Sequence, residues 1–101
     1  MTHPVLACEL SSAELQQRKA GLLATVRGHA TSVTSQPDGV ELEFPDSPAI
    51  LADILELVRL ETACCRFLRF DLTIGPASAP VRLRVSGPAG TLEFLETLGW
   101  T

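Results

Sequence analysis

The spacing of apolar residues changes several times along this chain, and each spacing predicts a different secondary structure. Between residues 15 and 26 it is helical, with apolar side chains at Leu15, Leu22, Leu23 and Val26. Just before them, Ser11 and Glu14 have the separation of a capping box, and Leu10 with Leu15 would form a hydrophobic staple. We therefore expect a first helix that is capped by Ser11 and ends near Gly28.

A second helical pattern begins at Ser47, which is followed by Pro48 at the first helical position. At about 100° per residue, the apolar side chains of this helix fall on one broad face. They are Ile50, Ile54, Leu57, Val58, Cys64, Cys65 and Leu68. We expect the helix to end at about Cys65 or Arg66.

Alternation of apolar and polar residues predicts four strands. They cover residues 30–35, 40–44, 68–74 and 81–85, and a last helix is expected over residues 89–98. The order α-β-β-α-β-β-α predicts the α+β class: a two-layer sandwich in which helices cover a four-stranded antiparallel sheet. We expect the first two helices to pack antiparallel on the apolar face of that sheet.

The polar positions of the strands predict one detail of the sheet. If the second and fourth strands are neighbours, Glu41 and Glu43 share a solvent-exposed face with Arg82 and Arg84. Exposed ion pairs of this kind stabilise a fold by only about 0–1 kcal/mol each.

Composition limits the classes of function. A chain of 101 residues, 46% of them hydrophobic, fits one domain over residues 1–101. The net charge of −4 and the scattered Lys and Arg residues argue against a nucleic-acid partner. No stretch approaches the roughly 20 apolar residues of a transmembrane helix, and the first residues lack a signal-peptide pattern. We therefore expect a cytoplasmic protein without a membrane partner, whose three cysteines serve as thiols, metal ligands or redox groups.

One acidic residue interrupts the apolar face of the second helix. Glu61 follows Leu57 by four residues and precedes Cys64 and Cys65 by three and four residues. A carboxylate in this position costs free energy unless it is paired or ligated. The functional interpretation is a site where the carboxylate lies buried near a cysteine sulfur. The alternatives are a salt bridge to an Arg at the edge of the core, or a carboxylate that reaches water.

The cysteine pair suits metal coordination better than nucleophilic attack. It lies at the C-terminal, negative end of a helix beside Glu61, and both features disfavour the thiolate. A bound metal deprotonates a coordinating thiol in spite of them. Adjacent cysteines on a helix point about 100° apart, so we expect Cys64 and Cys65 to be split between the core and a groove, with no disulfide between them.

Cys8 precedes the first helix, and it can join the pair only if the two helices run antiparallel. Cys8, Cys64, Cys65 and Glu61 would then form a ligand set for a thiophilic ion such as zinc, copper(I) or mercury(II). The spacing lacks the CxxC separation of known zinc modules, so the motif by itself identifies no metal.

The segment over residues 60–70, LETACCRFLRF, resembles the E-x-x-C-C-x-F-L-x-F segment of a family of small, mostly uncharacterised bacterial proteins. The resemblance extends to Cys8 before a capped helix, to residues 37–39 and to residues 87–95. Similar double-cysteine segments occur beside or fused to regulators of the mercury-resistance type, so the resemblance implies a link to thiophilic metals. This chain has Arg66 where that family has Pro, which puts a positive charge beside the thiols and would raise their reactivity.

The sequence leaves three hypotheses open. The first is a protein that binds a thiophilic metal ion, or responds to thiol redox state, through Cys8, Cys64, Cys65 and Glu61. The second is an enzyme with a cysteine nucleophile and Glu61 as general base. The third is a structural domain without chemistry that forms a homodimer through a sheet edge or a helix face.

Overall fold

The computed structural model describes residues 13–101. Its helices are α1 (Ala13–His29), α2 (Pro48–Cys64) and α3 (Thr91–Leu98), and its strands are β1 (Ser32–Gln36), β2 (Gly39–Phe44), β3 (Arg69–Thr73) and β4 (Val81–Ser86). The order α-β-β-α-β-β-α confirms the predicted α+β fold. The predicted cap at Ser11 and staple residue Leu10 lie outside the described residues.

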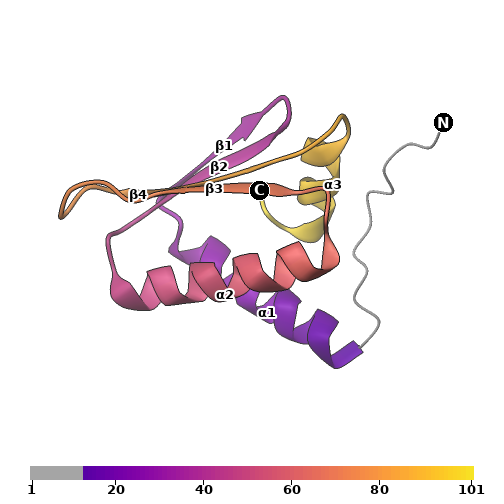
Figure 1. Cartoon of the computed structure of the whole chain (residues 1–101), viewed down its shortest axis with the longest axis horizontal. Helices are drawn as coiled ribbons and strands as arrows, with labels where there is room; N and C mark the ends of the chain where they lie inside the picture. The colour runs from indigo at the N-terminus through magenta and orange to yellow at the C-terminus, as the bar shows by residue number, and fades with distance from the viewer. Residues whose placement is uncertain (1–12) are drawn as a thin grey trace.

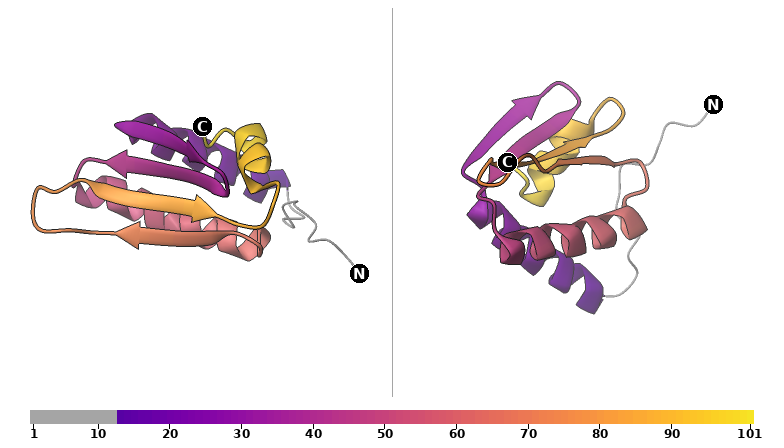
Figure 2. Two further views of the ribbon diagram at one scale, coloured as in Figure 1. Left: turned by 90° about the horizontal axis from the view of Figure 1, so that it is seen from above. Right: turned by 60° about the vertical axis from the view of Figure 1, so that its left-hand side comes forward.

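The four strands form one antiparallel sheet in the order β1-β2-β4-β3 (Figure 2). β2 and β4 are neighbours, as expected, with Glu41 opposite Arg84 and Glu43 opposite Arg82. Because side chains alternate along a strand, the same register directs the apolar residues between them to the other face. The sheet therefore has one charged face and one apolar face.

Helices α1 and α2 run antiparallel to each other and cover the apolar face of the sheet (Figure 1). Ser47 begins α2 as predicted, because its side chain accepts a hydrogen bond from the backbone N–H of Ile50. The antiparallel arrangement brings the first half of α1 beside the last turns of α2, where a side-chain contact joins Lys19 to Glu61. This is the orientation that the three-cysteine hypothesis requires.

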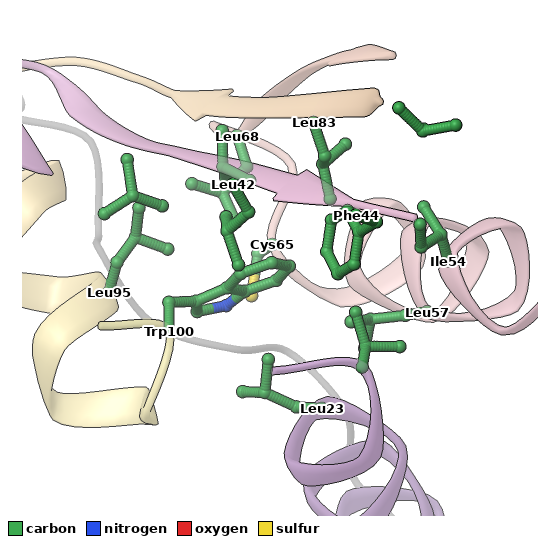
Figure 3. Packing of buried hydrophobic residues seen from close by; sticks show 14 of the residues in the cluster. Leu23, Leu42, Phe44, Ile54, Leu57, Cys65, Leu68, Leu83, Leu95 and Trp100 are labelled. Atoms are coloured by element: carbon green, nitrogen blue, oxygen red, sulfur yellow. The ribbon is translucent and has the colours of Figure 1, made fainter. Parts of the chain in front are cut away.

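The core lies between the sheet and the helices (Figure 3). Its fully buried members include Leu42 and Leu83 from the sheet, Leu57 from α2, Leu95 from α3 and Trp100 after α3. Helix α3 packs at one end of the sheet (Figure 2), and this position brings the C-terminal segment back over the last turn of α2. The last turn of α2 is thus in contact with α1 through Lys19 and with the C-terminal segment through Trp100.

The exposure of Leu15 and the start of α3 differ from the sequence predictions. Leu15, predicted to lie on the buried face of α1, is 40% exposed, because the first turn of α1 lies far from the sheet (Figure 1). Helix α3 begins at Thr91 and not at Ala89, because Gly90 has a left-handed backbone with φ 94° that helical residues do not adopt.

Within residues 13–101, no helix is both long and apolar enough to cross a membrane.

Candidate metal centre

Glu61 occupies the centre of the buried site. It lies in the last turn of α2, on the face that also carries Leu57 and Cys64, and its exposed fraction is 0%. The prediction that this carboxylate is buried beside the cysteines is confirmed. The helical spacing is the cause, because residues three and four positions apart share one face.

Two side chains from other elements bind the Glu61 carboxylate. The Lys19 ammonium of α1 lies 2.8 Å from Oε1, and the Trp100 indole donates a hydrogen bond to Oε2 over 3.2 Å. Lys19 is itself only 6% exposed. The negative charge is therefore balanced inside the core, as a buried carboxylate requires. The residue that pairs with Glu61 is a lysine of α1, and not the arginine considered in the sequence analysis.

Both cysteine sulfurs of the pair lie close to the same carboxylate oxygen. The Oε1 atom of Glu61 is 3.8 Å from Sγ of Cys64 and 3.5 Å from Sγ of Cys65. Both cysteines have an exposed fraction of 0%, so the prediction that one of them faces a groove is wrong. Cys65 is the C-cap of α2 with φ −115° and ψ 78°, so it has left the helical backbone and its side chain does not follow the helical step.

The two sulfurs of the pair are neighbours but are not bonded to each other. Their separation is 3.3 Å, whereas a disulfide bond is about 2.05 Å long. The expected absence of a Cys64–Cys65 disulfide is therefore confirmed. Cys64 is disulfide-bonded in this structure, so only the reduced protein offers both sulfurs as ligands. Cys8 lies outside the described residues, and its approach to the pair stays a prediction.

The donor atoms of Glu61, Cys64 and Cys65 fit a metal ion. All three lie within 4.8 Å of one another. At zinc bond lengths, a tetrahedral site separates sulfur from oxygen by roughly 3.5 Å and sulfur from sulfur by roughly 3.8 Å. The sulfur–oxygen separations of 3.5 and 3.8 Å are close to the sulfur–oxygen edge, whereas the sulfur–sulfur separation of 3.3 Å is shorter than the sulfur–sulfur edge. Two sulfurs and one carboxylate oxygen form a soft donor set, which favours thiophilic ions.

Lys19 and Trp100 are site residues that the sequence pattern did not predict. A signal for Lys19 was present, because it follows Leu15 and precedes Leu23 by four residues each, so it lies on the same face of α1 as these apolar residues. Trp100 carries no such signal. It comes after the last helix, and only the folded chain brings it beside Glu61.

A surface hollow of about 220 Å³ is lined by residues of α1 and α2. Its walls are formed by Arg18, Glu56, Arg59, Leu60 and Ala63. Neither cysteine of the pair lines this hollow.

Comparisons with known proteins add no relative to this description. No family model matches the chain, and neither a curated protein nor a solved structure matches it.

Proposed function

We propose that the reduced protein binds a thiophilic metal ion through Cys64, Cys65 and Glu61, with Cys8 as a further ligand. One observation carries the proposal: two sulfurs and a carboxylate oxygen converge, fully buried, within 4.8 Å. A buried site of this kind excludes competing water and holds its ligands at fixed positions. The resemblance to double-cysteine segments near mercury-resistance-type regulators points to the same class of ion, and it stays a prediction.

The position of α1 supports the part assigned to Cys8. Lys19 lies 2.8 Å from Glu61, so the first half of α1 lies beside the last turns of α2. Residues 8 to 13, if extended, span at most about 17 Å. Cys64 is disulfide-bonded and Cys65 is not its partner, and we propose Cys8 for that role. Oxidation then removes two ligands from the site, and reduction restores them.

The contacts of Glu61 give less support to a cysteine nucleophile. A general base must accept a proton from the attacking thiol, but here Lys19 and Trp100 already engage both carboxylate oxygens. A nucleophile must also meet its substrate, and both sulfurs are fully buried. A metal ion that stays bound does not require a substrate to reach the sulfurs.

Equilibrium dialysis of the reduced protein against Zn²⁺ or Hg²⁺, followed by elemental analysis, tests the proposal. We expect one ion per chain, no binding to the oxidised protein, loss of binding in the C64S/C65S variant and weaker binding in Glu61→Gln. Glu56→Gln is the matched control for Glu61→Gln, because Glu56 lies on the same helix but is paired with Arg18 at the surface. Equal binding of both ions by C64S/C65S and the unaltered protein would disprove the proposal.

A further inference from the structure

We propose that the site prefers a trivalent pyramidal ion of the arsenite and antimonite class to the divalent or linear ions named above. This inference rests on the proposed function, because it assumes that Cys64 and Cys65 act together as ligands. It is carried by two independent features: the separation of the two sulfurs and the position of the Lys19 ammonium.

The short distance between the sulfurs selects a small bond angle at the ion. With sulfur–ion bonds of about 2.3 Å, the separation of 3.3 Å, which is observed while Cys64 is disulfide-bonded, corresponds to an angle near 90°. A tetrahedral ion needs roughly 3.8 Å between the sulfurs, and a linear two-coordinate ion needs roughly 4.6 Å. Trivalent arsenic and antimony form pyramidal compounds with bond angles near 90–100°, as expected when one position is held by a lone pair.

The surroundings of the sulfurs resist a wider separation. Cys64 and Cys65 are adjacent in sequence and fully buried, and close packing in a core opposes displacements of this size. A linear ion such as mercury(II) would have to move them apart by more than about 1 Å. A pyramidal ion requires little change.

The charge balance of the site favours a neutral ligand. The Lys19 ammonium lies 2.8 Å from Oε1 of Glu61 and 3.6 Å from Sγ of Cys64. A divalent cation that bound these same two atoms would meet the ammonium at short range in a medium of low dielectric constant. Arsenous acid, As(OH)₃, is uncharged at neutral pH, so once it is bound the charges of Lys19 and Glu61 still balance each other.

The binding step is balanced without an external oxidant or reductant. As(OH)₃ reacts with the two reduced thiols; two As–O bonds break as two As–S bonds form, and each departing hydroxide takes one thiol proton to leave as water. The oxidation states of arsenic and sulfur do not change. The remaining As–OH group lies on the Glu61 side, where Oε1 accepts its hydrogen bond. Lys19, which is 6% exposed, is the flexible side chain that must move aside for entry.

The buried indole of Trp100 provides the readout. It is the only tryptophan of the chain, and its Nε1 lies 3.2 Å from Oε2 of Glu61. We would titrate the reduced protein with arsenite, Zn²⁺ and Hg²⁺ separately and record tryptophan fluorescence. Competition between pairs of ligands then ranks their affinities, with glutathione present at a fixed concentration as the thiol competitor.

The expected result is a one-to-one fluorescence change with arsenite, which competes at least about tenfold more effectively than Zn²⁺ and is lost in Cys65→Ser. If Zn²⁺ or Hg²⁺ binds and arsenite does not, this inference is wrong and the proposed function stands. If none of the three binds, both are wrong. Should Cys65→Ser fail to fold, arsenic X-ray absorption of the unaltered protein decides: two or more sulfur neighbours support the inference, and fewer than two overturn it.

Discussion

At the scale of single residues, the site is organised by one buried ion pair. Glu61 and Lys19 have side-chain exposures of 0% and 7%, and their charged atoms are 2.8 Å apart. The loss of one partner from such a pair leaves the other charge buried and uncompensated. Arg18, the neighbour of Lys19 in sequence, forms an ion pair of the same length with Glu56, but at the surface. The two pairs allow a matched comparison.

We expect Lys19→Met to lower the free energy of unfolding by roughly 3–5 kcal/mol. Arg18→Met should lower it by about 0–1 kcal/mol, because its pair is solvated. The double variant Lys19→Met/Glu61→Met should recover most of the loss, since it removes both buried charges. Urea unfolding followed by circular dichroism measures all three. Equal effects of the two single variants would show that the Lys19–Glu61 pair is not buried in solution.

The residue-level prediction of the site was right where helix periodicity applies. Glu61, Cys64 and the preceding apolar residues of α2 share a face because of their spacing alone. Periodicity could not place Cys65, because the helix ends there and the backbone changes direction. It could not identify Trp100 either, because a contact across 39 residues depends on the tertiary fold.

At the scale of elements, the close pairing of β2 and β4 holds the sheet together. Gly39 begins β2 opposite Ser86, and a Cβ atom at Gly39 would collide with the backbone carbonyl of Val85. The backbones approach so closely here that only glycine fits. Gly21 in α1 provides a contrast, because a Cβ atom there meets nothing within 4 Å.

Gly39→Ala should therefore destabilise the protein by at least about 1–3 kcal/mol, the usual cost of an overpacked site. Gly21→Ala should be neutral or stabilise it by up to about 1 kcal/mol, because alanine favours the helix interior. Thermal unfolding of both variants checks the pair. A Gly39→Ala variant as stable as Gly21→Ala would contradict the observed register of β2 and β4.

The elements themselves could be predicted from sequence because their signals are local. The strand signal of β2 is the alternation of apolar residues at Val40, Leu42 and Phe44, and the start of α2 is indicated by Ser47 and Pro48. Both signals depend only on neighbouring residues. The limits of α3 could not be predicted, because the left-handed conformation of Gly90 decides them. The exposure of Leu15 depends on how far α1 extends from the sheet. The spacing of apolar residues within α1 gives no information about that distance.

At the scale of the whole molecule, the two faces of the sheet differ in character. Helices α1 and α2 cover one face (Figure 1), and the other face carries charged pairs such as Glu43–Arg82 at 3.1 Å. Their side chains are 32% and 57% exposed. A second subunit on this face would bury these charged pairs.

Glu43→Ala tests whether that face is open in solution. An exposed pair stabilises the fold by about 0–1 kcal/mol, so the variant should unfold at almost the same urea concentration as the unaltered protein. Analytical ultracentrifugation of both proteins serves as the control for assembly. A loss of several kcal/mol, together with a change in mass, would show that a second subunit covers the face.

The proposed function requires that Cys64 and Cys65 act together as ligands to a thiophilic ion. X-ray absorption spectroscopy tests it most directly, on the reduced protein loaded with zinc in one sample and with arsenite in another. We expect at least two sulfur neighbours at about 2.3 Å in the sample that binds, and none in the C64S/C65S variant. Spectra that contain only oxygen or nitrogen neighbours in both samples would contradict it.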